Sequence, residues 1–132
     1  MAGWGTGSFE NEDAAAWLAK LGAITPAELM KILSDAAENS DYVEAPAASV
    51  VVAAAEVIAT AYGSPGNGTP PQVTEWVAKN PQMLNPAIND QAIRALEHVR
   101  RNSELKDLWL QADGLNDWIA AIKDLQSRLA PQ

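Results

Sequence analysis

The chain has 132 residues, of which 48% are hydrophobic, and this predicts a single domain over residues 1–132. Its net charge of −8 disfavours nucleic acids and anionic lipids as partners, and the lack of cysteine excludes disulfide bonds and cysteine-ligated zinc. No apolar run approaches the roughly 20 residues of a membrane span, and the start carries no secretory signal. We therefore expect a cytoplasmic protein that does not bind membranes.

The first residues alternate glycine with large aromatic side chains. Gly3, Gly5 and Gly7 surround Trp4, and Phe9 follows. Glycine allows the backbone angles of a tight return, and the aromatic side chains bury surface only if this segment folds back onto the domain. The pattern predicts a structural motif packed on the core.

The next segments predict helices separated by short breaks. The first helix covers about residues 12–21 and ends at Gly22. A capping box over 25–28 starts the second helix, because threonine, proline and glutamate stand at the required positions. The third helix begins near Pro46 and stops at Gly63, before a turn-rich loop.

Four further helices are predicted in the second half of the chain. A short one opens at 69–72 and breaks at 80–81, and 83–86 is an irregular connector. Another closes around Asn102, after which Ser103 caps a short helix. The last helix has a continuous apolar stripe, formed by Leu115, Trp118, Ile119, Ile122, Leu125 and Leu129.

Six or seven short helices predict a compact all-α bundle. Trp17, Trp109 and Trp118 lie on apolar helix faces and are expected in the core. Trp76 has few apolar neighbours in its short helix, so it is our first choice for an exposed aromatic anchor. We favour the alternative, in which Trp76 caps one end of the bundle.

The opening resembles that of a bacterial family, domain-of-unknown-function family 4259. Its members begin Met-Gly-x-Trp-Gly-x-Gly-x-Phe, followed by an acid and Asn-Asp, and here Glu10 and Asn11 match the acid and the asparagine. The chain departs from this pattern in two places: residues 1–4 read Met-Ala-Gly-Trp, and Glu12 stands in place of aspartate. Residues 42–44, 53–59 and 103–109 resemble later elements of the family. The resemblance implies a fold and no activity, and it includes Asn11 in the N-terminal motif.

Glu56 interrupts an apolar run in the third predicted helix. A buried carboxylate is costly unless it is paired or hydrogen-bonded. The helical wheel places Glu56 on a small, semi-polar stripe, which favours a solvated or boundary position. The alternative is that Glu56 accepts amide hydrogen bonds from the glycine-rich N-terminal segment, in which case Glu56→Ala would loosen Trp4.

The charge is concentrated in the first part of the chain. Residues 1–75 carry ten acidic and two basic side chains, whereas 76–132 carry seven of each. An acidic surface can serve solubility alone, or it can bind a basic protein. The candidates for such an interaction surface are Glu10, Glu12, Asp13 and Trp76.

Asp35, Glu38, Asp41 and Glu44 recur every three residues. On one helix they would nearly align, and paired carboxylate helices hold magnesium in all-α nucleotide pyrophosphohydrolases. The intervening residues suggest instead that the helix ends within this run, which predicts a solvated acidic turn. The single histidine, His98, lies among charged residues and is expected at the surface or its boundary.

No set of residues forms a recognisable catalytic group, and we expect no cofactor. The sequence therefore favours a non-enzymatic protein-interaction module with an acidic surface. An immunity-type inhibitor of a basic toxin is one concrete form. The alternative is a magnesium-dependent enzyme similar to the all-α nucleotide pyrophosphohydrolases, with the acidic residues of 35–44 as metal ligands.

Overall fold

The computed structural model describes residues 7–38, 41–66 and 68–131, so the predicted roles of Gly3, Trp4 and Gly5 lie outside the described residues. Within these ranges the fold is all-α, with no strand, as predicted. The α-helices and the two 3₁₀ turns (η1, η2) are α1 (Glu12–Ala19), η1 (Leu21–Ala23), α2 (Pro26–Glu38), α3 (Ala45–Ala61), α4 (Pro71–Lys79), η2 (Pro81–Met83), α5 (Pro86–Arg101), α6 (Glu104–Gln111) and α7 (Leu115–Leu129).

The predicted caps form at two helix starts. The Glu28 amide donates to Thr25 Oγ1 at 3.2 Å, and the Thr25 hydroxyl donates to Glu28 Oε1 at 3.0 Å. Ser103 Oγ accepts from the Lys106 amide at 3.1 Å. These contacts satisfy amides that have no partner within the first turn of a helix, so they fix where α2 and α6 begin.

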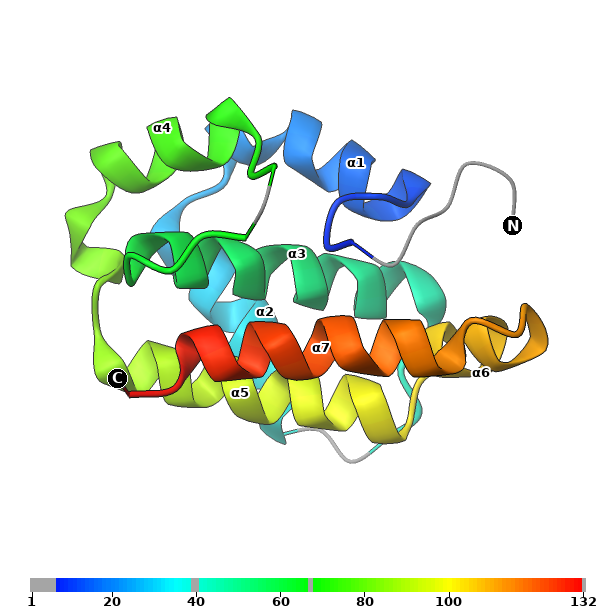
Figure 1. Ribbon diagram of the computed structural model, residues 1–132. Helices are drawn as coiled ribbons and strands as arrows, with labels where there is room; N and C mark the ends of the chain where they lie inside the picture. Colours follow the sequence, from blue (N-terminus) through cyan, green and yellow to red (C-terminus); the bar gives the residue numbers. More distant parts are fainter. Residues whose placement is uncertain (1–6, 39–40, 67, 132) are drawn as a thin grey trace.

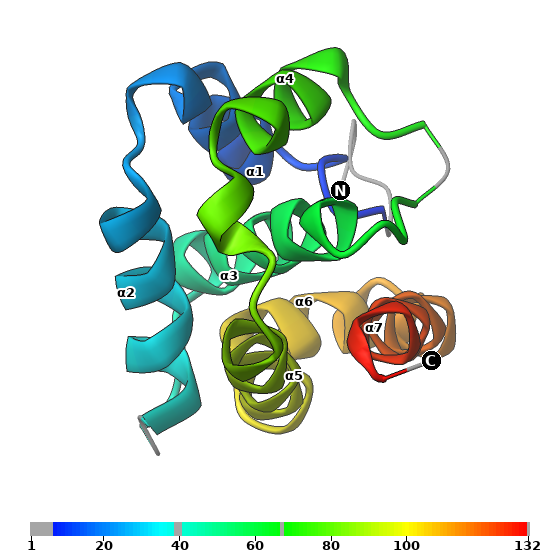
Figure 2. The same ribbon diagram turned by 90° about the vertical axis from the view of Figure 1, so that its left-hand side faces the viewer.

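Helix α3 is the centre of the molecule and contacts every other α-helix. In Figure 1 it lies between α1 and α4 on one side and α5 and α7 on the other. Figure 2 shows α2 along the flank of α3 and α5. Every residue of 51–59 is buried, because the other helices surround this stretch of α3.

The tryptophans of the apolar faces lie in the core, as predicted. Trp17, Trp109 and Trp118 are all buried. Trp76 is also buried, with 5% of its surface exposed, so the prediction of an exposed anchor is wrong. Its indole Nε1 donates to the backbone oxygen of Ile24 at 2.9 Å, which ties α4 to the turn before α2.

The connection between α2 and α3 is held against α6. Val43 forms an isolated parallel bridge with Ser103, and the Tyr42 hydroxyl donates to Asp107 Oδ2 at 2.7 Å. This hydrogen bond raises the pKa of Tyr42 to about 12. His98 is half-buried at the boundary, as expected, with Nε2 2.7 Å from the backbone oxygen of Asp41.

Candidate functional site

The carboxylate of Glu56 is buried, with 4% of the residue exposed, so the favoured boundary position is wrong. Arg128 binds it through both terminal nitrogens, with Nη1–Oε1 at 2.5 Å and Nη2–Oε2 at 3.0 Å. The Ser8 hydroxyl donates to Oε2 at 2.8 Å, and the Gly66 amide donates to Oε1 at 3.0 Å. The desolvation cost of the buried charge is therefore offset by a cation and two further donors.

These four hydrogen bonds fill the acceptor capacity of the Glu56 carboxylate. A general base or a metal ligand needs a free lone pair, and Glu56 has none left in this arrangement. The group that we call the Glu56–Arg128 cluster, formed by Glu56, Arg128, Ser8 and Gly66, is therefore suited to holding chain segments together.

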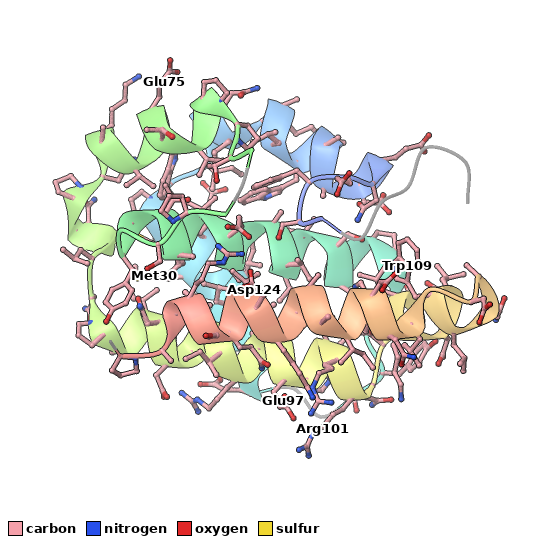
Figure 3. All side chains as sticks on the ribbon, viewed as in Figure 1. Met30, Glu75, Glu97, Arg101, Trp109 and Asp124 are labelled. Atoms are coloured by element: carbon pink, nitrogen blue, oxygen red, sulfur yellow. The ribbon has the colours of Figure 1, made fainter. Side chains whose placement is uncertain are left out.

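Arg128, on α7, is fixed by two further contacts. Its Nη1 also donates to the Ser64 backbone oxygen at 3.1 Å, and its Nε donates to Asp124 Oδ2 at 2.9 Å. The hydrogen bond with Glu56 raises the pKa of Arg128 above its ordinary value. Asp124 lies on the edge of α7 that faces α3 (Figure 3). The guanidinium thus joins α7 to α3 and to the loop after α3.

The described part of the N-terminal motif folds back onto the domain. The Gly7 amide donates to Glu10 Oε1 at 2.8 Å, and Asn11 Oδ1 accepts from the Ala14 amide at 2.8 Å, which caps α1. Phe9 packs partly buried against the core. The link from this segment to Glu56 is the Ser8 hydroxyl, whereas the amide that Glu56 binds belongs to Gly66 in another loop.

A pocket of about 510 Å³ lies beside the Glu56–Arg128 cluster. It is bounded by the N-terminal return (residues 7–10), the loop after α3 and the side of α7 that faces α3. Its lining residues are Gly7, Ser8, Phe9, Glu10, Glu56, Gly66, Gly68, Thr69, Ala121, Asp124 and Arg128. The cluster forms one wall of this pocket.

The four acidic residues of 35–44 do not form a metal site. Asp35 and Glu38 lie on α2, which ends at Glu38, and Asp41 and Glu44 lie in the connection that follows. Among the described residues no three histidine, aspartate or glutamate side chains come close enough to hold a metal ion. All four are exposed, and we call them the acidic α2–α3 surface.

An apolar groove adjoins this surface. It has a volume of about 440 Å³, and we call it the α2–α3 groove. Its lining residues are Ile32, Asp35, Ala36, Val43, Pro46, Ala47, Val50 and Val51. Asp35 is the one charged side chain among them, and Lys31 pairs with it at 2.8 Å in a solvent-exposed contact.

The other predicted interaction residues lie at the start of α1. Glu10 and Glu12 are exposed and Asp13 is half-buried. Glu12 and Asp13 lie in the first turn of α1, where negative side chains interact favourably with the helix dipole and stabilise the helix. Glu10 closes the N-terminal return, so these residues have structural roles in addition to any binding role.

The residues that complete the Glu56–Arg128 cluster, namely Ser8, Gly66 and Arg128, were not predicted from the sequence. One signal was available. Residues 50–59 are apolar around the whole helix apart from Glu56, which is typical of a fully buried helix. A carboxylate in such a helix requires a cation, but the sequence does not show which of the nine lysine and arginine residues supplies it.

These elements define an all-α domain whose central helix carries a buried ion pair. A family model described as a domain of unknown function (DUF4259) matches residues 3–121, and the chain belongs to that family. The matched region includes Ser8, Glu56 and Gly66 and ends before Arg128. No curated protein and no solved structure matches the chain in the comparisons made. Within the described ranges, no helix has the length and apolar character needed to cross a membrane.

Proposed function

We propose that this chain is a small protein-interaction module whose acidic α2–α3 surface binds a basic protein. The observation that carries the proposal is the exposure of Asp35, Glu38, Asp41 and Glu44 around one helix connection. Residues 26–61 contain a single basic side chain, Lys31, against the four exposed carboxylates of this surface, so the two helices contribute an excess of negative charge here. A surface of one sign attracts partners of the opposite sign and raises their association rate.

An inhibitor that binds a basic toxin, as an immunity protein does, is one concrete form of this proposal. The hydrogen bonds of the Glu56–Arg128 cluster give its buried carboxylate a structural role, because they occupy its acceptor positions. Solubility alone is the competing explanation of the acidic surface. The two explanations differ in whether a defined partner depends on these carboxylates.

The experiment exposes three immobilised forms of the protein, used as baits, to a cell lysate at low salt and compares the proteins that each bait retains. One bait is the wild type. The second carries the neutral substitutions Asp35→Asn, Glu38→Gln, Asp41→Asn and Glu44→Gln. The third is a control with the same change in net charge, placed at exposed carboxylates elsewhere: Glu75→Gln, Asp90→Asn, Asp113→Asn and Asp117→Asn.

We expect a basic protein that binds the wild type and the control bait, is lost from the second bait, and is released by salt. Equal retention of the same proteins on all three baits would contradict the proposal. In that case the acidic α2–α3 surface would serve solubility.

A further inference from the structure

We infer that the α2–α3 groove docks one amphipathic helix of a partner, with apolar side chains in the groove and lysine or arginine side chains against the acidic α2–α3 surface. This inference rests on the proposed function and adds the kind of segment that binds. It is carried by the juxtaposition of an apolar groove and exposed carboxylates on the same two helices.

The groove has an apolar base and accessible sides. Ala36, Val43 and Val51 are buried at its base. Pro46 and Ala47, at the start of α3, are exposed at its side. An apolar depression open to solvent on a strongly charged chain is typical of a docking site.

The charges around the groove select a positive partner. Asp35 lines the groove, and the exposed residues Asp41 and Glu44 stand close to Val43 along the chain. Lys31, the basic residue of this region, already pairs with Asp35. An occupant that combines apolar and basic side chains therefore matches the surface in both respects.

The backbone around the groove favours a helix over an extended segment. A strand would need free backbone groups at an edge, but the Val43 amide donates to the Asn102 oxygen at 3.1 Å and the Val43 oxygen accepts from the Glu104 amide at 2.8 Å. Proline-rich segments dock on aromatic side chains, and no aromatic residue lines the groove. A helix with an apolar stripe is the remaining common mode, and the small side chains of Ala36 and Ala47 allow its close approach.

A second copy of this chain does not fit the groove in the same way. Each copy has a net charge of −8, and symmetric contact would bring two acidic α2–α3 surfaces together. Anionic membranes are disfavoured for the same reason. A basic helix of another protein meets neither obstacle.

The test uses a fluorescently labelled peptide with leucines on one helical face and lysines on the flanking positions. A second peptide has the same composition in an order that breaks the stripe. Both are titrated at low salt into the wild type, Ala47→Arg and Ala120→Arg. Residues 47 and 120 are exposed helical alanines, and both substitutions add one positive charge, so only the location differs.

We expect the striped peptide to bind the wild type saturably. Its affinity should be at least about tenfold lower for Ala47→Arg than for Ala120→Arg. The reordered peptide should bind the wild type more weakly than the striped peptide does. In ¹⁵N spectra of the wild type, the striped peptide should shift the amides of Ala36, Val43, Ala47 and Val51. Equal affinities of the two variants, shifts confined to another face, or no saturable binding would overturn the inference.

The neutral variant of the acidic α2–α3 surface separates this inference from the proposed function. If the neutral variant no longer binds the striped peptide whereas Ala47→Arg still binds it, the acidic surface binds the peptide but the groove does not dock the helix. If the neutral variant still binds the striped peptide and Ala47→Arg does not, the groove docks the helix and the proposed binding through the acidic surface fails.

Discussion

The guanidinium of Arg128 and the carboxylate of Glu56 lie 72 positions apart in the sequence and form a two-pronged ion pair inside the bundle. The Glu56 side chain is 6% exposed and the Arg128 side chain 21%. The pair connects the last helix to the central one, and Ser8 and Gly66 join through the same carboxylate. One buried charge thus holds the N-terminal return, the loop after α3 and α7 in place.

Glu56→Ala should lower the free energy of unfolding by about 3 kcal/mol, because it leaves Arg128 part-buried without its main partner. Urea unfolding of the purified protein measures this change. Asp124→Asn is the control, since it removes a partner of Arg128 that is 67% exposed and should cost less than about 1 kcal/mol. If Glu56→Ala lowers the free energy of unfolding no more than Asp124→Asn does, the buried ion pair is not the main stabilising contact of Arg128.

Gly66→Ala should destabilise the protein by about 1–3 kcal/mol, because the added Cβ would lie 2.9 Å from Glu56 Oε1 and 3.3 Å from both terminal nitrogens of Arg128. Either the loop or the ends of the paired Glu56 and Arg128 side chains must then shift, which weakens the hydrogen bonds of the cluster. Gly22→Ala is the control, since nothing lies within 4 Å of its added Cβ. Thermal unfolding of the two variants measures the difference, and equal midpoints would contradict the geometry of the cluster.

Trp76→Phe should lower the free energy of unfolding by about 1–3 kcal/mol more than Trp17→Phe does. Both substitutions remove the same atoms from buried indoles. Trp76 loses its hydrogen bond to Ile24, whereas the buried Nε1 of Trp17 has no partner among the described residues. Unfolding curves of the two variants test the difference, and the reverse order would refute the role assigned to the Trp76–Ile24 contact.

Glu97 predicts a loss of stability in acid. Figure 3 shows Glu97 and Arg101 on the outer side of α5, and Arg100 and Gln126 also bind this carboxylate. The hydrogen bond from Arg100 is the main cause that lowers the pKa of Glu97 to about 2 from 4.5. Because the folded pKa lies below the unfolded one, this stabilisation is present above pH 4.5 and is lost as the pH falls toward 2.

Glu97→Gln tests this dependence. The variant should be less stable than the wild type by on the order of 1 kcal/mol near neutral pH, after allowance for solvent screening, and the gap should shrink at about pH 3. Urea unfolding at the two pH values gives both differences. A gap that stays constant or widens in acid would contradict the assigned pKa shift.

The helix boundaries follow from local signals, and this is why the sequence predicts them well. The Thr25–Glu28 box and the Ser103 cap depend on residues three positions apart, and the structure contains both. The apolar stripe of 115–129 likewise predicts α7. These features need no knowledge of how the helices pack.

The partners of Glu56 and Trp76 could not be predicted, because they come from distant parts of the chain. The helical wheel separates a semi-polar stripe from an apolar one on α3, but helices surround α3 between residues 51 and 59, where both stripes are buried. Trp76 has few apolar neighbours within its own helix, yet its hydrogen-bond partner, Ile24, lies 52 positions away. Burial is a property of the packed bundle, and the sequence of one helix does not contain it.

The most direct test of the proposed function is the association rate of the captured basic partner, measured at increasing salt with the wild type and with the neutral variant of Asp35, Glu38, Asp41 and Glu44. We predict that the wild type associates faster at low salt and that its rate falls steeply toward that of the variant as salt increases. Equal association rates that do not depend on salt would contradict binding through the acidic α2–α3 surface.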